Sequence, residues 1–286
     1  MGICFNPLYI RFMDTSASHR HARSVAEAAA RAAGTVIRRY VGADPSVEAK
    51  GTNDFVTEAD TAAQEAVVQV LQDAFPDDAI LAEEQDDAEL AASDYDGRRW
   101  IIDPIDGTTN FMHALPPYAV SIALQEGPEI VAAVVYDVAH DGLYAATKDE
   151  GATCNGEPIH VNQTTNLSDA LVATGFPYRR VEHIDTYLQV LRDVLLTTRG
   201  VRRHGAAAID LVRVAAGHVG AFYETGLRPW DVAAGALILR EAGGMLTDFE
   251  GQGALTPIFE RQVMATNGRL HDALQPLLAP LIDTHA

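Results

Sequence analysis

The chain has 286 residues, of which 48% are hydrophobic, and its formal net charge is −19. This length allows one large domain or two medium ones with a sizeable core, and the composition excludes global disorder. The charge argues against a nucleic-acid partner, because no excess of cations can replace phosphate counterions. No apolar run is long enough to span a membrane, so we expect no membrane association. The two cysteines are too few for a disulfide framework, which fits a reducing cytoplasm.

The first part of the sequence indicates two helices and a short strand. Apolar residues recur at helical intervals over Val25–Tyr40 and again over Thr57–Phe75, where Pro76 ends the pattern. Ile80-Leu81 then predicts a short strand. We expect the residues before the first helix to form a loose tail.

A set of short hydrophobic runs follows, and it predicts a mostly antiparallel sheet. Asp141-Gly142 and Asn155-Gly156 lie between runs and are typical of hairpin turns. The expected strands are Tyr118–Leu124, Ile130–Tyr136, Leu143–Ala146 and Ile159–Val161.

The second half alternates strands with helices, which favours an α/β sheet layered by helices. The expected strands are Leu171–Thr174, Val201, Gly220–Tyr223, Met245–Leu246 and Val263–Ala265, and the expected helices are His183–Leu196, Ala207–Ala216 and Val232–Ala242. We therefore divide the chain into a tail over residues 1–18, an α+β half over 19–160 and an α/β half over 161–286.

The segment Trp100–Phe111 holds the most informative chemistry. Its β-branched start predicts a buried strand, and Pro104 is expected to end that strand. Asp103 and Asp106 would then lie close together with the Ile105 carbonyl between them. Carboxylate and carbonyl oxygens are ligands for hard cations held against a phosphate. The alternative is a capped turn in which both carboxylates accept backbone N–H bonds.

Other acidic residues lie near similar structural boundaries. Asp54 and Asp60 bracket the start of the second helix, Glu83 and Glu84 follow a short strand, and Asp231 precedes a helix. Each alone could be a solvated helix face, a charged loop or an N-cap. Their shared position beside strand ends, Gly, Pro or Trp favours a common cluster, whose oxygen ligands would suit Mg²⁺ or Mn²⁺ better than Zn²⁺.

These motifs resemble those of the inositol monophosphatase family, the magnesium-dependent, lithium-sensitive sugar-phosphate phosphatases. The matching segments are Asp103–Phe111, Trp230–Gly235 running on to Glu241–Gly244, Asn53–Asp60, and the pair Glu83-Glu84. The resemblance implies a layered α-β-α-β-α sandwich of the sugar phosphatase type, with the metal-binding motifs mainly in the first half of the chain.

The resemblance also implies roles for individual residues. One Mg²⁺ would be held by Glu83, Asp103 and the Ile105 carbonyl, a second by Asp103, Asp106 and Asp231, and a third, weaker ion would lie near Glu83. Thr108 and Asp60 would activate the attacking water, supported by Glu84. Gly107 and Thr108 would face the phosphate, and the substrate hydroxyls would meet Asp106, Gly205, Ala206, Ala207 and Glu224.

The expected reaction is hydrolysis of a small phosphorylated polyol or sugar, with inositol-1-phosphate as the leading substrate. A fructose-1,6-bisphosphatase or broad sugar phosphatase is the nearest alternative, and a non-enzymatic regulatory module is another, since some bacterial relatives contact the transcription machinery. A homodimer is expected from the resemblance. Ala206 stands where many relatives have Ser or Thr, which puts a preference for inositol in doubt.

Several nearby residues have weaker claims to function. His113 is expected to be a wall residue rather than a catalyst, and Cys154 a structural residue. The basic run Arg202–His204 could be a solvated strand end, a dimer surface or a group that steers the substrate phosphate.

Overall fold

The computed structural model describes residues 7–42, 47–51, 54–84, 95–178 and 181–285. Its α-helices are α1 (Pro7–Tyr40), α2 (Glu58–Ala74), α3 (Thr108–Met112), α4 (Ile184–Thr197), α5 (Ala207–Ala215), α6 (Pro229–Glu241), α7 (Thr256–Phe259) and α8 (His271–Leu278). Its strands are β1 (Val47–Gly51), β2 (Asp54–Thr57), β3 (Ala79–Ala82), β4 (Arg98–Asp106), β5 (Ala119–Glu126), β6 (Glu129–Asp137), β7 (Gly142–Thr147), β8 (Ala152–Cys154), β9 (Glu157–Pro158), β10 (Leu171–Thr174), β11 (Gly200–Arg202), β12 (Ala221–Thr225), β13 (Met245–Thr247) and β14 (Gln262–Thr266).

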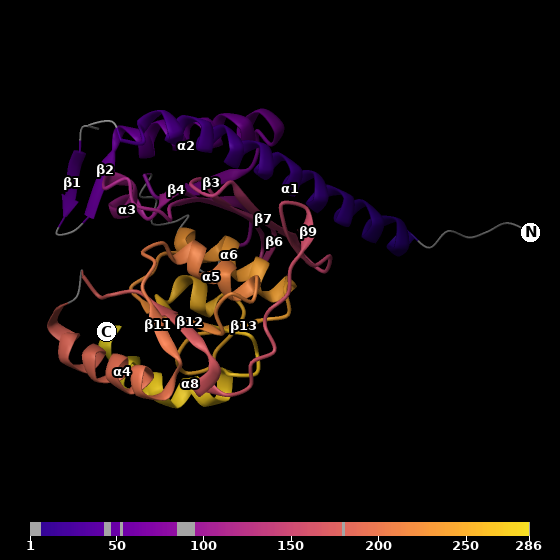
Figure 1. Cartoon of the computed structure of the whole chain (residues 1–286). Helices are drawn as coiled ribbons and strands as arrows, with labels where there is room; N and C mark the ends of the chain where they lie inside the picture. Colours follow the sequence, from indigo (N-terminus) through magenta and orange to yellow (C-terminus); the bar gives the residue numbers. More distant parts are fainter. Residues whose placement is uncertain (1–6, 43–46, 52–53, 85–94, 179–180, 286) are drawn as a thin grey trace, which may run out of the picture.

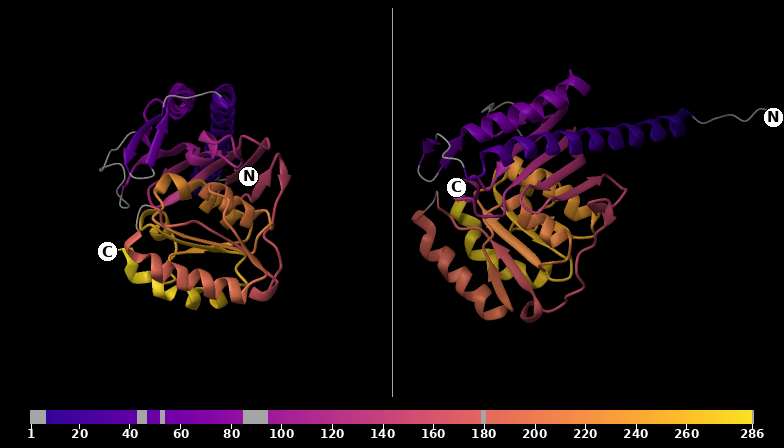
Figure 2. Two further views of the ribbon diagram at one scale, coloured as in Figure 1. Left: turned by 60° about the vertical axis from the view of Figure 1, so that its left-hand side comes forward. Right: turned by 45° about the horizontal axis from the view of Figure 1, so that its top comes forward.

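Helices and sheets alternate in layers through the molecule (Figure 1). The helices α1 and α2 cover one face of a seven-stranded sheet, and α5 and α6 lie between that sheet and a five-stranded one. The outer face of the five-stranded sheet is covered by α4 and α8, which Figure 2 shows from two further sides. This confirms the layered α-β-α-β-α arrangement that the resemblance implied.

The seven-stranded sheet runs in the order β3-β4-β5-β6-β7-β8-β9, and every pair except β3–β4 is antiparallel. Its two faces enter different cores because side chains alternate along each strand. On β4, Trp100 and Ile102 pack toward α1 and α2, whereas Ile101 packs toward α5 and α6. One face of the sheet therefore packs against α1 and α2, and the other packs against α5 and α6.

The five-stranded sheet has the order β11-β10-β12-β14-β13, and its first three strands are parallel. Above it, α6 is buried along most of its length, as expected for a helix placed between two sheets. A Cβ at Gly235 would lie 2.6 Å from the Leu211 side chain, so this glycine permits the close contact of α6 with α5.

Most expected elements are present, with two clear differences. Helix α1 begins at Pro7, within the expected tail over residues 1–18. Pro7 is followed by no further Gly or Pro up to Ser18, and proline is well tolerated in a first helical turn. The expected strand Ile159–Val161 is absent, and the short hairpin of β8 and β9 precedes it instead. The division of the chain into halves near residue 160 stays a prediction. None of the described helices has the length and apolar character needed to cross a membrane.

Candidate functional site

The two central carboxylates, Asp103 and Asp106, lie on one face of β4 because the strand contains a bulge. Between their register partners, β5 has one residue fewer than β4. Pro104 has no N–H for the ladder, and the Ile105 N–H donates to Asp103 Oδ1 at 2.9 Å. Residues three apart in a regular strand face opposite sides, and the additional residue of a bulge returns them to the same side. The prediction that Pro104 ends the strand is therefore wrong, since β4 continues to Asp106.

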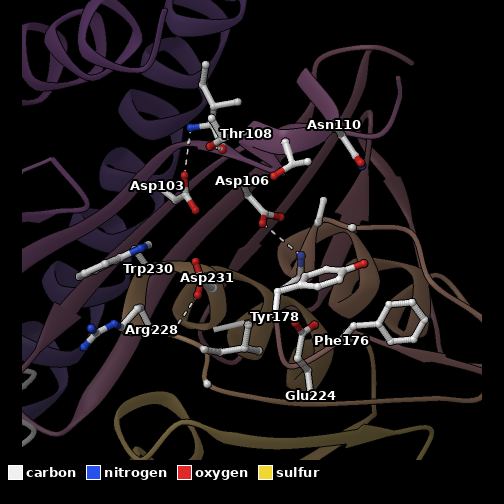
Figure 3. A pocket seen from close by; sticks show the side chains of 18 of the residues that line it. Asp103, Asp106, Thr108, Asn110, Phe176, Tyr178, Glu224, Arg228, Trp230 and Asp231 are labelled. Atoms are coloured by element: carbon white, nitrogen blue, oxygen red, sulfur yellow. Dashed lines mark hydrogen bonds between the residues drawn. The ribbon is translucent and has the colours of Figure 1, made fainter. Parts of the chain in front are cut away.

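Asp231 completes a group of three carboxylates. Oxygen atoms of Asp103, Asp106 and Asp231 all lie within 4.8 Å of one another, and Figure 3 shows the three side chains around a common space. Asp231 lies in the first turn of α6, where the N-cap residue is Arg228. The Arg228 N–H donates to Asp231 Oδ2 at 2.7 Å, which fixes the orientation of this carboxylate.

Burial, together with the close approach of these groups, raises the pKa of two of them. Burial, followed by the charges of Glu83, Asp106 and Asp231, raises the pKa of Asp103 well above its usual range. Burial and the Asp231 charge raise the pKa of Asp106 to about 8, although bonds from the α5 backbone oppose this. The group therefore needs protons or cations to neutralise it. A donor set made of oxygen atoms fits Mg²⁺ or Mn²⁺.

The first turn of α5 is joined to the carboxylate group through Asp106. The N–H groups of Ala207 and Ala208 donate to Asp106 Oδ1 and Oδ2 at 3.1 and 2.8 Å. The N-cap residue Ala206 makes no side-chain capping bond. Asp106 therefore satisfies two N–H groups that a helix N-terminus leaves without intrahelical partners, and it ties β4 to the inner helix layer.

Thr108 and Asp60 meet beside the same group. Thr108 Oγ1 lies 3.3 Å from Asp60 Oδ1 and 3.0 Å from the Ile105 carbonyl oxygen. Asp60 lies on α2 and is only 1% exposed. The Thr108 hydroxyl has one proton, so it can donate to only one of the two acceptors at a time.

A cavity of about 610 Å³ opens over the carboxylate group. The expected site residues that line it are Glu83, Asp103, Ile105, Asp106, Gly107, Thr108, Gly205, Ala206, Ala207, Glu224 and Asp231. Asp60 is connected to the cavity through Thr108. Glu84 is not among the lining residues, and its N–H donates to Gln64 Oε1 at 3.2 Å. The roles assigned to all these residues stay predictions.

Glu224 enters the cavity because residue 175 is a glycine. A Cβ at Gly175 would lie 1.8 Å from the carboxyl group of Glu224. Burial raises the pKa of Glu224 well above its usual range, with Asp210 adding to the effect and Arg203 opposing it. The loop after β10 and strand β12 thus place a carboxyl group on the wall opposite β4 (Figure 3).

Sequence reasoning did not single out the aromatic residues of the cavity wall. Phe176 and Tyr178 line it, and the Arg203 guanidinium lies 5.6 and 5.2 Å from their ring centroids. Trp230 and Asn110 also line the cavity. The position of this aromatic pair directly after β10 could have indicated a ligand contact, because ligands often bind beyond the carboxyl ends of parallel strands.

The weaker candidates lie elsewhere or have structural partners. His113 caps the end of α3 and is exposed, and Cys154 lies on β8; neither lines the cavity. His204 Nδ1 is hydrogen-bonded to Asp210 Oδ1, which is buried in α5. Within the run Arg202–His204, Arg203 is the residue that lines the cavity.

Comparison with known proteins agrees with this arrangement. The model of the inositol monophosphatase family matches residues 19–285. The chain is 42% identical to the Nus factor SuhB of Escherichia coli (strain K12) over 230 residues. The matched region covers 80% of this chain and 85% of that protein. The solved structure of extragenic suppressor protein suhB from Bartonella henselae has a TM-score of 0.83 and 38% identity, covering 90% of this chain and 98% of that one. The inositol monophosphatase of Anabaena (Nostoc) has a TM-score of 0.79 and 37% identity, covering 91% and 96%. The chain therefore belongs to the inositol monophosphatase family.

Proposed function

We propose that the chain is a Mg²⁺-dependent phosphatase that hydrolyses a small phosphorylated polyol or sugar, with inositol-1-phosphate as the leading substrate. The observation that carries this proposal is the group of three carboxylates within 4.8 Å on the floor of a cavity of about 610 Å³. A carboxylate floor alone repels a dianionic ester. It becomes a phosphate site when divalent cations reverse its charge.

The residues present fit such cations. Asp103, Asp106 and Asp231 offer carboxylate oxygens, and Glu83 and Ile105 line the same cavity. Bound Mg²⁺ would neutralise charge on the ester and lower the pKa of a water molecule. The raised pKa values of Asp103 and Asp106 support the assignment, because they show how strongly this group favours a compensating charge.

Thr108 and Asp60 are suited to orient the attacking water. When the Thr108 hydroxyl donates its proton to Asp60, a lone pair of Oγ1 remains to accept a proton from water. In that arrangement the Ile105 carbonyl no longer receives the Thr108 proton and keeps its lone pairs for a cation. The two roles that the resemblance gives to Thr108 and Ile105 are therefore compatible.

The polyol would lie between Asp106 and Glu224. The loop Gly205–Ala207 and the Glu224 carboxyl group form this part of the wall, and Gly107 lies where the phosphate would meet the start of α3. Because Ala206 has no hydroxyl, selectivity for inositol would depend on Glu224 and backbone groups. A fructose-1,6-bisphosphatase or a broad sugar phosphatase is the alternative within the same chemistry.

A panel of phosphate esters tests the proposal. Phosphate release from inositol-1-phosphate, fructose-1,6-bisphosphate and a nucleoside 3′-phosphate is measured with Mg²⁺ and with EDTA. We expect Mg²⁺-dependent turnover with the highest kcat/KM for inositol-1-phosphate. Asp103→Asn, which removes a central charge, should lower kcat by at least about 1000-fold while the circular dichroism spectrum is unchanged. Turnover in EDTA, or an active Asp103→Asn variant, would contradict the proposal.

A regulatory function is the second candidate, since relatives with 42% identity are named Nus factors. A wild-type chain that releases no phosphate from any ester at saturating Mg²⁺ would favour it. The expectations of a homodimer, a cytoplasmic location and no nucleic-acid partner stay predictions; the last rests on the net charge of −19.

A further inference from the structure

The cavity has two walls that come from distant parts of the chain. One wall contains the bulge of β4 and the start of α3, which carry the carboxylates and Thr108. The other contains the loop before α5, with Gly205–Ala207. Hydrolysis of a polyol phosphate needs a fixed distance between these walls, because the ester group must reach the carboxylates while the hydroxyls contact the loop.

Asn110 joins the two walls. Its Nδ2 donates to the Pro117 carbonyl and to the His204 carbonyl, each at 2.8 Å. A side-chain amide has two N–H hydrogens, so both are used. The backbone carbonyl of Asn110 accepts the N–H groups of His113 and Leu115, which fixes the turn that follows α3. Asn110 lines the cavity and is labelled in Figure 3.

Close backbone packing surrounds this amide. A Cβ at Gly205 would lie 3.0 Å from both terminal atoms of the Asn110 amide, so the loop passes directly against that group. Gly107 has φ +92°, and a Cβ there would lie 3.1 Å from the Gly205 carbonyl and 3.2 Å from that of Pro117. The two walls therefore pack closely at these glycines, and Asn110 is hydrogen-bonded from one wall to the other.

We propose that Asn110 is a positioning residue that sets the place of the polyol-binding loop relative to the carboxylate group and thereby selects hydroxylated esters. The proposal rests on the phosphatase function above. The N–H groups of Ala207 and Ala208 also bind this part of the chain to Asp106, but these residues follow Gly205 in the sequence. The Asn110 bond holds the preceding carbonyl, of His204, so it controls where the loop enters the wall.

The test compares two esters that differ in what this loop can contact. Inositol-1-phosphate has ring hydroxyls, whereas p-nitrophenyl phosphate has none. The selectivity ratio is kcat/KM for inositol-1-phosphate divided by kcat/KM for p-nitrophenyl phosphate. Asn110→Ala should lower this ratio by roughly ten- to a hundredfold, mainly by raising KM for inositol-1-phosphate. Asn110→Ser, which can donate one hydrogen, should give a smaller decrease and is the milder variant for folding. The Mg²⁺-induced rise in melting temperature should match that of the wild type in both.

Asn162 provides a matched control. Its Nδ2 also donates to two backbone carbonyls, those of Gly217 at 3.1 Å and Val219 at 3.0 Å, but it does not line the cavity. Asn162→Ala should lower the melting temperature and leave the selectivity ratio at the wild-type value.

An unchanged ratio in Asn110→Ala would overturn the inference, and so would an equal change in Asn162→Ala. Loss of the Mg²⁺-induced rise in melting temperature would also overturn it, because Asn110 would then act on the carboxylate group itself. A wild type that hydrolyses neither ester would overturn the proposed function and this inference with it, whereas an active wild type with an unaffected ratio in Asn110→Ala refutes the inference alone.

Discussion

In the absence of divalent cations, the melting temperature should fall as pH rises from about 6.5 to about 8. The pKa of Asp106 is raised from 3.8 to about 8 in the folded chain, and that of Asp103 is also raised. A carboxyl group of this kind stabilises the fold fully below its unfolded pKa, and that stability is lost as pH rises through the folded pKa. The window starts near pH 6.5 because buried His271, whose pKa is lowered, has the opposite effect below about that value.

The magnitude follows from the same groups. While a carboxyl group is protonated in the folded chain and ionised in the unfolded one, each pH unit costs about 1.4 kcal/mol of unfolding free energy. Asp106 then accounts for roughly 1–2 kcal/mol over the window, and Asp103 acts in the same direction. Two charges 4.8 Å apart repel by about 3 kcal/mol at an effective dielectric constant near 20, which is the same scale. At about 2 °C per kcal/mol for a chain of this length, Asp106 alone should lower the melting temperature by about 2–4 °C.

Differential scanning fluorimetry in EDTA and in Mg²⁺ measures the effect, with ionic strength held constant because an acidic surface is stabilised by screening alone. Mg²⁺ at about a hundredfold excess over Kd should add roughly 2.7 kcal/mol. Its effect should be larger at the higher pH, where the ligands are ionised. Asp106→Asn should reduce the pH dependence measured in EDTA. A wild-type melting temperature that stays constant or rises in EDTA would refute the reasoning, as would a wild-type slope in Asp106→Asn.

The remaining predictions concern the cavity wall. Thr108→Ala should lower kcat by about 100-fold with little change in KM, because the Thr108–Asp60 pair is proposed to orient the attacking water. A change confined to KM would indicate that Thr108 binds the ester instead. Gly175→Ala should raise KM for inositol-1-phosphate, because the new Cβ would occupy the place of the Glu224 carboxyl group, and unchanged steady-state kinetics would contradict that contact. Arg203→Gln should lower kcat/KM a few-fold at low ionic strength but not in about 0.5 M salt, if its guanidinium steers the dianionic ester; a difference that persists in salt would indicate direct contact.

The fold could be predicted where local patterns are long or chemically distinctive. The periodic segment Thr57–Phe75 forms α2, with bounds one residue shorter at each end. Asn155-Gly156 forms the turn between β8 and β9, and both residues have the positive φ that such a turn requires. The prediction of a strand at Ile159–Val161 was wrong, because a short apolar run does not show whether a neighbouring strand is available to pair with it. In the structure the Val161 N–H donates to the Ala242 carbonyl after α6.

The convergence of acidic motifs could be predicted from the sequence, but the backbone geometry that produces it could not. The acidic motifs indicate Asp103, Asp106 and Asp231, because these carboxylates stand beside Pro104, Gly107 and Trp230 in the sequence. The bulge that turns two of them to one side is not visible, since it depends on the register of β4 with β5. The bond from Asn110 to His204 spans 94 residues and likewise has no local signal.

The hydrogen bonds that orient the three carboxylates explain why these groups can bind cations. Each accepts a backbone N–H: Asp103 from Ile105, Asp106 from the start of α5, and Asp231 from Arg228. A lysine or arginine bonded to each carboxylate would also fix its orientation, but its full charge would neutralise the group and compete with a cation. An N–H fixes orientation with only a partial charge. The backbone therefore orients these side chains, and the negative charge of Asp103 and Asp106 is balanced by protons below their raised pKa values and by divalent cations above them.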